Sequence, residues 1–295
     1  ARQLTEFVTS IPSDTIDANL DNQTFNISTT NNSASFNTIA ADEFPSVTTV
    51  TNEKPILKIQ KDDLIKAVNR VAFACATDDI KPVLTGVLLE ISGENISFVG
   101  TDGLRLSRQI IKLESSAAKE INILVPVKAL FELSHIVSEI DEDDDIEMYF
   151  IEDRNQVLFR YGDVDLVSRL IDGQFPEYRQ IIPTGYKTLC KVSKTDFLNS
   201  LKVTNIIAKS VLGNKIILDI DPKTGKITMS ATQTDLGSNK SVFEGKIEGD
   251  ALRIAFSSRL LADILNHIDS EDIIFECSET IKPGVFKIVD DPDFV

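Results

Sequence analysis

The sequence repeats two helix-and-strand patterns, and this repetition constrains the fold more than any single motif does. The first pattern is a helix, a run of short strands and a turn rich in acidic, aromatic and proline residues, and it begins near residues 2, 126 and 256. The second pattern is a helix followed by two strands with a short turn between them, and it begins near residues 58 and 191. Self-similarity of this kind predicts equivalent units that are stacked or arranged in a circle.

The order of the two patterns predicts a domain division. Because the patterns alternate and the chain opens inside the first one, we expect the sequence to be a piece of a longer protein. We expect residues 1–50 to be the C-terminal half of a first domain and residues 51–183 to be a second domain. Residues 184–295 would be a third domain that lacks its last strand. The length of the chain alone suggests about two domains.

Composition limits the class of protein. Hydrophobic residues make up 42% of the chain, enough for sizeable cores, and no stretch approaches the roughly 20 apolar residues of a membrane span. The chain has three cysteines, Cys75, Cys190 and Cys277, without a CxxC pair. This usage fits a reducing compartment and neither a disulfide framework nor a zinc site, so we expect a soluble, cytoplasmic protein whose cysteines are buried.

The net charge of −16 argues against binding to nucleic acid, but only if the charge is spread evenly. Helical periodicity predicts an uneven distribution. In the helix expected at 62–76, the residues from Leu64 to Cys75 form an apolar stripe, and Lys66 and Arg70 lie on the opposite face. The helix expected at 194–209 and the helix that begins near residue 126 also carry basic residues away from their stripes, namely Lys202, Lys209 and Lys128. Ordinary solvated helix faces are the alternative, which recurrence across equivalent units makes weaker.

Alternating hydrophobicity and β-branched residues predict strands between these helices. The segments with this pattern are 86–92, 95–101, 122–127, 146–152, 156–162, 165–171, 215–221, 226–232 and 241–247. Short turns at 92–95 and 221–225 join neighbouring strands. We therefore expect an α+β fold in which each domain contains two helices and two similar small antiparallel sheets, related by internal pseudosymmetry.

Three segments together resemble one protein family: GVLLEISGENISFVGTDGLRLS at 86–107, LVPVKALFEL at 124–133 and LVSRLIDGQFPEYRQIIP at 166–183. They resemble the bacterial DNA polymerase III beta subunit, the DNA sliding clamp, and the resemblance extends over the whole chain. It implies pseudosymmetric clamp domains in a head-to-tail homodimeric ring, with helices around the hole and sheets outside. It also implies a processivity factor that holds double-stranded DNA without sequence preference and has no catalytic residues. An acidic rim can then coexist with a basic lining.

The resemblance also implies a groove between domains two and three that binds short apolar peptides from the replicative polymerase subunit, the clamp loader and other partners. Its residues would be Leu84, Thr101, Gly103, Leu104, Arg105, Leu106, Pro176, Ile181, Ser257, Leu260 and Val285. Leu104 occupies a position where the family often has a residue with a polar ring, and Leu260 occupies one where an aromatic residue is frequent. A plain turn at the end of a strand is the alternative role for Thr101 and Gly103.

The remaining sites are the DNA-facing surface and the joint between subunits. The DNA-facing candidates are Lys66, Arg70, Lys128, Lys202 and Lys209. Only Lys128 matches a DNA-facing position of the family, and the others follow from helical phase. The joint would contain Phe36, Ile206 and Ile207, and we expect residues 1–295 alone to be monomeric or weakly dimeric.

The sequence leaves two other classes of function open. A metal-dependent phosphodiesterase would use the acidic run Asp141–Asp145, which also fits a solvated loop and lacks the spacing of a metal site. A repeat scaffold would bind proteins only, and a comparison of circular with linear DNA separates it from a clamp. The sequence contains neither GxGxxG nor GxxxxGK[ST] and no nucleophile arrangement, so we expect no cofactor, metal or catalytic residue.

Overall fold

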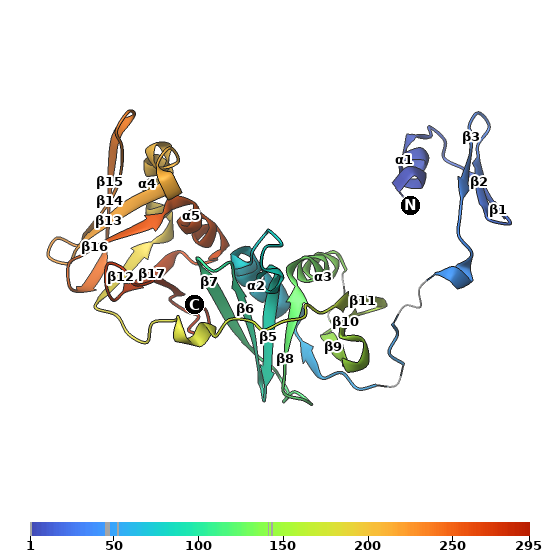
Figure 1. Cartoon of the computed structure of the whole chain (residues 1–295), viewed down its shortest axis with the longest axis horizontal. Coiled ribbons are helices and arrows are strands. Elements are labelled where there is room, and N and C mark those ends of the chain that lie inside the picture. Colours follow the sequence, from blue (N-terminus) through green and yellow to red (C-terminus); the bar gives the residue numbers. More distant parts are fainter. Residues whose placement is uncertain (1, 45–47, 52, 141, 143) are drawn as a thin grey trace. The chain divides into compact units, whose positions relative to one another are not determined.

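The computed structural model describes residues 2–44, 48–51, 53–140, 142 and 144–295. The chain forms two compact units, residues 1–50 and residues 51–295 (Figure 1). The first unit contains α1 (Arg2–Ser10), the antiparallel strands β1 (Asp17–Asp21), β2 (Thr24–Ser28) and β3 (Ser33–Asn37), and the short helix η1 (Ala41–Glu43). Its helix packs on its sheet through an edge-to-face contact of Phe7 with Phe36, whose ring centroids are 5.9 Å apart.

The second unit has two regions, which we call the central region (residues 51–183) and the C-terminal region (residues 184–295). The strands of the central region are β4 (Leu57–Ile59), β5 (Gly86–Ser92), β6 (Asn95–Thr101), β7 (Leu106–Lys112), β8 (Ile121–Pro126), β9 (Ile146–Ile151), β10 (Gln156–Tyr161) and β11 (Val164–Arg169). Its helices are α2 (Lys61–Val71), η2 (Ala72–Ala74), η3 (Pro82–Thr85), α3 (Val127–Glu139), η4 (Glu152–Arg154) and η5 (Tyr178–Gln180). The strands form two four-stranded antiparallel sheets, ordered β7-β6-β5-β8 and β11-β10-β9-β4.

The C-terminal region repeats this plan. Its strands are β12 (Thr188–Ser193), β13 (Lys215–Asp221), β14 (Lys226–Gln233), β15 (Gly237–Gly249), β16 (Leu252–Ser257), β17 (Asp272–Cys277) and β18 (Val285–Ile288). Its helices are α4 (Lys194–Ala208), η6 (Leu212–Asn214) and α5 (Ser258–His267). Ser193 caps α4, because its hydroxyl accepts a hydrogen bond from the Asp196 amide at 3.3 Å.

Each region has its own hydrophobic core between its helices and one face of its sheets. In the central region the apolar stripes of α2 and α3, represented by Leu64, Val68 and Leu133, are buried against the inward residues of the strands. In the C-terminal region Phe197 and Leu201 of α4 are buried in the same way. The amphipathic periodicity of the helices and the alternation of the strands therefore produce a helix layer on a sheet layer.

The sheets of the C-terminal region differ from the expected pair of separate small sheets. They form one seven-stranded sheet of order β16-β13-β14-β15-β12-β17-β18. The reason is the length of β15, 13 residues. Its residues 237–244 pair with β14, and its residues 245–249 pair with β12. In the central region β7 ends at Lys112, and among the described residues no strand continues from one sheet into the other.

The segment that ends at Val295 crosses from the C-terminal region to β7, the edge strand of the β7-β6-β5-β8 sheet in the central region. The amide of Arg108 in β7 donates to the carbonyl of Val295 at 2.7 Å, and the Val295 amide donates back to Arg108 at 2.9 Å. The Ile110 amide donates to Asp293 at 3.0 Å. Phe294 lies between these pairs and is fully buried. Main-chain pairing therefore joins the two regions beside the site described below.

Two further features of the fold concern the lengths of its helices and the state of its cysteines. No helix in the described part of the chain is both long and apolar enough to span a membrane. Cys75, Cys190 and Cys277 are all buried and free. Burial raises the pKa of each thiol to about 12, so these thiols stay protonated and pack as small apolar side chains.

Candidate functional site

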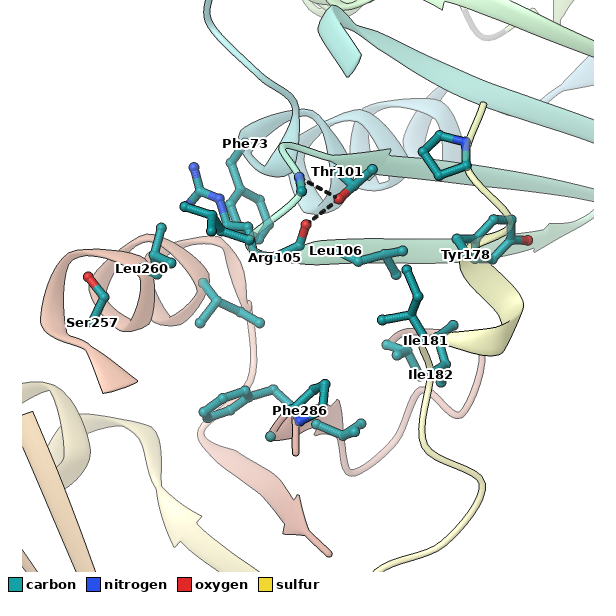
Figure 2. A pocket seen from close by; sticks show the side chains of 18 of the residues that line it. Phe73, Thr101, Arg105, Leu106, Tyr178, Ile181, Ile182, Ser257, Leu260 and Phe286 are labelled. Carbon is teal, nitrogen blue, oxygen red and sulfur yellow. Dashed lines mark hydrogen bonds between the residues drawn. The ribbon is translucent and has the colours of Figure 1, made fainter. Parts of the chain in front are cut away.

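A largely apolar cavity of about 390 Å³ lies between the central and C-terminal regions (Figure 2). One side is formed by the end of β6, the following turn and the start of β7. A second side is formed by the segment between β11 and β12, residues 170–187, which we call the connector; it contributes Pro176, Tyr178 and Ile181. Helix α5 and strand β18 of the C-terminal region form the third. A cavity lined mainly by apolar side chains with a few polar groups is the usual form of a binding site.

The turn between β6 and β7 is held by side-chain hydrogen bonds. The Thr101 hydroxyl donates to the Arg105 carbonyl at 2.5 Å and accepts from the Gly103 amide at 3.0 Å. A carboxylate oxygen of Asp102 accepts from the Leu104 and Arg105 amides at 2.8 and 3.0 Å. Gly103 has a φ of +91°, which a residue with a Cβ atom rarely adopts. The TDG segment thus builds a fixed turn, and that turn also lines the cavity.

The connector packs against the β7-β6-β5-β8 sheet of the central region. A small buried cluster consists of Leu84, Val99, Leu124, Phe175 and Tyr178. The Tyr178 hydroxyl donates to Glu90, and Arg179 forms an ion pair with the same carboxylate at 2.8 Å. Burial, and then the neighbouring Glu90 carboxylate, raise the pKa of the Tyr178 hydroxyl. These contacts fix the connector wall of the cavity.

Every groove residue predicted from the sequence lines this one cavity. These residues are Leu84, Thr101, Gly103, Leu104, Arg105, Leu106, Pro176, Ile181, Ser257, Leu260 and Val285. Leu104 and Ile181 are 79% and 55% exposed, so apolar side chains stand free at the mouth. Leu84 is buried and forms part of the floor. The structure therefore brings together residues that are up to 201 positions apart (84 to 285) in the sequence.

Sequence reasoning missed several lining residues. These are chiefly aromatic and aliphatic residues: Phe73, Tyr178, Ile182, Phe256, Leu261, Ile264 and Phe286. Two of them had a local signal, because Tyr178 ends the LIDG-x-FP-x-Y segment and Ile182 lies in an apolar stretch of the connector. Phe73 had none, since its position in η2, directly after α2, also fits the core of the central region.

The prediction that Arg70 faces solvent and DNA is wrong, because its side chain is buried. Its side chain is only 6% exposed and reaches across to the C-terminal region. Its Nε donates to Asp269 at 3.0 Å, and its Nη1 donates to Asp291 at 2.7 Å and to Gln109 at 2.9 Å. Lys66 is half-buried and pairs with the same Asp291 at 2.6 Å. Helical periodicity correctly placed Lys66 and Arg70 on the face of α2 that points away from the core of the central region. The C-terminal region, however, packs on that face.

The other DNA-facing candidates are exposed. Lys128 lies at the start of α3, Lys202 lies in the middle of α4, and Lys209 follows the end of α4. No salt bridge to any of the three is found among the described residues. These ammonium groups are therefore available to an anionic partner in a chain whose net charge is strongly negative.

The candidates for a subunit joint occupy different environments. Phe36 lies in β3 and packs on Phe7 within the first unit. Ile206 in α4 is 62% exposed, whereas the neighbouring Ile207 is half-buried and packs on the core of the C-terminal region. Ile206 is thus the residue of this pair that presents an apolar side chain to solvent.

No cluster of three or more His, Cys, Asp or Glu side chains with the arrangement of a metal site is found in the described ranges. Two members of the acidic run that suggested a phosphodiesterase, Asp141 and Asp143, lie outside the described residues. The chemistry that the described cavity supports is non-covalent binding of an apolar segment.

Comparisons with known protein families agree with this arrangement of regions. Residues 58–177 match the family model of the central domain of the DNA polymerase III beta subunit. Residues 179–295 match the model of the C-terminal domain of the same subunit. The two matches are consecutive and meet within the connector.

The chain is also similar to individual proteins. It is 32% identical over 250 residues to the beta sliding clamp of Synechococcus elongatus, covering 84% of this chain and 65% of that protein. It is 30% identical over 251 residues to the beta sliding clamp of Staphylococcus epidermidis, covering 85% of this chain and 64% of that protein. The chain thus spans slightly less than two thirds of the length of these relatives.

Solved structures show the same fold. The DNA polymerase sliding clamp of Bacillus subtilis superposes with a TM-score of 0.90 at 26% identity, covering 99% of this chain and 76% of that chain. The DNA polymerase III beta subunit of Thermotoga maritima gives a TM-score of 0.86 at 26% identity, covering 99% and 77%. The predicted α+β clamp fold is therefore confirmed.

Proposed function

The chain belongs to the DNA polymerase III beta subunit family, and we propose that it acts as a DNA sliding clamp. In this role the protein encircles double-stranded DNA without reading its sequence and holds the replicative polymerase on the template. It is a non-catalytic processivity factor of the cytoplasm that works as a homodimeric ring. Family membership supports the proposal, together with the single observation that carries it: the predicted groove residues, distant in sequence, line one apolar cavity.

We propose that this cavity binds short peptides of the polymerase subunit, the clamp loader and other partners. Leu106, Pro176 and Ile181 provide the apolar surface for an anchoring side chain. Thr101 and Gly103 fix the turn that bounds it. Because hydrogen bonds within the chain hold this turn in place, less of the cavity wall has to be ordered on binding, which favours affinity from a short segment.

We propose that DNA is held by diffuse charge. Lys128, Lys202 and Lys209 would contact phosphates, which position a duplex without specifying its sequence. The many acidic residues keep the rest of the surface from binding DNA, so affinity stays low enough for sliding. We propose that Phe36, Ile206 and Ile207 lie at the joint between subunits, where the exposed Ile206 would become buried.

Two substitutions in the intact protein test whether groove and DNA surface are separate. Leu106→Asp places a charge in the apolar cavity and should abolish binding of a fluorescein-labelled polymerase-tail peptide. Truncation of an anchoring residue commonly costs about 2 kcal/mol or more, roughly a 30-fold loss of affinity, and a buried charge costs more. Lys202→Glu should weaken DNA binding and leave peptide affinity unchanged.

Fluorescence anisotropy measures peptide and duplex binding for both variants, and circular dichroism checks that each is folded. If the two substitutions reduce peptide binding equally, the assignment of groove and DNA contact to separate surfaces is wrong. If the unmodified protein binds neither the peptide nor DNA, the proposed function itself is wrong.

A further inference from the structure

Arg105 and Phe73 line the groove from the central region, yet each also contacts a residue on helix α5 of the C-terminal region. The Arg105 guanidinium donates from Nε to Asp102 at 3.1 Å and from Nη1 to Asp263 at 2.5 Å. Its central carbon lies 5.3 Å from the centroid of the Phe73 ring. Figure 2 shows Phe73 and Arg105 together at the end of the groove beside α5, where Leu260 also lies.

The Phe73 ring has a second neighbour on α5. His267 stacks on it, with ring centroids 4.5 Å apart and an angle of 14° between the rings. The His267 Nδ1 lies 2.7 Å from the Asp263 carbonyl oxygen, so Nδ1 carries the proton and donates to that oxygen. The Arg105 guanidinium therefore contacts the Phe73 ring, which in turn contacts the His267 ring, across the junction between the central and C-terminal regions. Asp263 contacts both Arg105 and His267.

We propose that Asp263 and His267 are positioning residues for the groove, an inference that rests on the proposed function. Neither side chain lines the cavity, so each acts through a residue that does. Asp102 alone fixes only Nε of Arg105 and leaves the guanidinium free to turn. The bond from Nη1 to Asp263 fixes its plane, and the stacked His267 holds the Phe73 ring beside it.

The partly buried state of this cluster makes the positioning effective. The side chains of Arg105 and Asp102 are 18% and 17% exposed, and that of Asp263 is 38% exposed. Water competes less for hydrogen bonds at such sites than at an open surface, so a lost partner is replaced less completely. A long arginine side chain that regains rotamer freedom must then be ordered again when a peptide binds, which lowers affinity.

A double-substitution cycle in the intact protein tests whether Asp263 acts through Arg105. Asp263→Asn keeps the size of the side chain and removes its charge, and it should weaken binding of the labelled polymerase-tail peptide about five- to ten-fold. Arg105→Gln removes the residue that is positioned. If the inference is correct, adding Asp263→Asn to Arg105→Gln has no further effect on the peptide dissociation constant.

Asp269→Asn is the matched control. It removes another carboxylate from the same junction, but its partner Arg70 does not line the groove. We expect peptide affinity to stay within about two-fold of the unmodified protein, because the contact that it loses is not connected to Arg105. Additive effects of Asp263→Asn and Arg105→Gln, or an equal loss with Asp269→Asn, would show that Asp263 only holds the two regions together, and would overturn the inference.

The stacked ring has its own test. His267→Ala removes the contact with Phe73 and should weaken the peptide about three-fold, and His267→Phe should restore most of the affinity because it restores an aromatic face. Equal affinities of the Ala and Phe variants would contradict a role for the ring. If the unmodified protein binds the peptide and Leu106→Asp abolishes binding while Asp263→Asn has no effect, the positioning inference fails and the proposed function stands.

Discussion

Helices α2 and α4 occupy equivalent places in the two regions, but they present opposite kinds of surface. Both bury an apolar stripe in their own core. On α4 the side of the helix away from the stripe leaves Lys202 in solvent. On α2 the corresponding side carries Arg70, which is buried by the C-terminal region and pairs with Asp269 and Asp291. A basic residue opposite an apolar stripe can thus serve a junction as readily as a free surface.

The difference follows from what each charge needs when it leaves water. A buried guanidinium is costly unless its donors are satisfied. Arg70 meets this requirement with Asp269, Asp291 and Gln109, and its guanidinium also lies 5.6 Å from the Phe294 ring. Lys202 keeps its hydration and needs no partner. The α2 surface therefore contributes to stability, and the α4 surface remains available for binding.

The largest effect is expected when Arg70 is removed. Arg70→Ala leaves Asp291 partly buried without its closest guanidinium partner, and the free energy of unfolding should fall by about 2–4 kcal/mol. Lys202→Ala on α4 should change it by less than about 0.5 kcal/mol. Urea unfolding followed by circular dichroism compares the two. Equal, small changes would mean that the junction contact adds nothing to stability, and the contrast between the helices would be lost.

A smaller effect concerns DNA. If α4 contacts phosphates and α2 does not, Lys202→Ala should make the slope of log affinity against log salt shallower by about 0.9, the value for one released counterion. Lys66→Ala should leave the slope unchanged, because the Lys66 ammonium pairs with Asp291. The measurement is anisotropy of a short labelled duplex over a series of salt concentrations. A shallower slope for Lys66→Ala would restore α2 as a DNA-facing helix.

The smallest effect is the acid sensitivity of the junction. Burial raises the pKa of the Asp291 carboxyl, but its bonds to Lys66 and Arg70 outweigh burial and hold that pKa below its usual range. A carboxyl with a depressed folded-state pKa stabilises the protein above its unfolded pKa of about 3.9, and this contribution is lost as pH falls through the folded value. The unfolding free-energy difference between unmodified protein and Asp291→Asn should be constant above about pH 5 and shrink below about pH 4.

A control sharpens this comparison. Asp235 is exposed, and Asp235→Asn should follow the unmodified protein across the same pH range. Urea unfolding at each pH provides the free energies. A difference between unmodified protein and Asp291→Asn that does not change with pH would show that the ionised carboxylate of Asp291 does not stabilise the junction.

Much of the fold could be predicted because its signals are local. The apolar stripe of α2 and the alternation in β5 and β6 indicate which side of each element faces its own core. The groove residues followed from the family resemblance that the TDG-x-RL segment (101–106) and the LIDG-x-FP-x-Y segment (170–178) carry, and the structure places those residues around one cavity. Helical phase also identified Lys202 as an exposed basic residue.

The missed features depend on contacts between distant segments. Nothing near Arg70 in the sequence indicates Asp269 or Asp291, which lie about 200 residues away. The pairing of Val295 with Arg108 and the stack of His267 on Phe73 likewise join segments that no local pattern connects. The continuous sheet of the C-terminal region required the length and register of β15, because strand alternation is the same whichever neighbour pairs.

The most direct test of the clamp proposal is whether the intact protein is held on DNA by topology. Protein loaded onto a nicked circular plasmid is separated from free protein by gel filtration, and the plasmid is then cut at one site. A clamp remains with the circle through the column and is released after the cut, because a linear molecule has ends from which a ring slides. Equal retention on circular and linear DNA, or retention on neither, would contradict the proposed function.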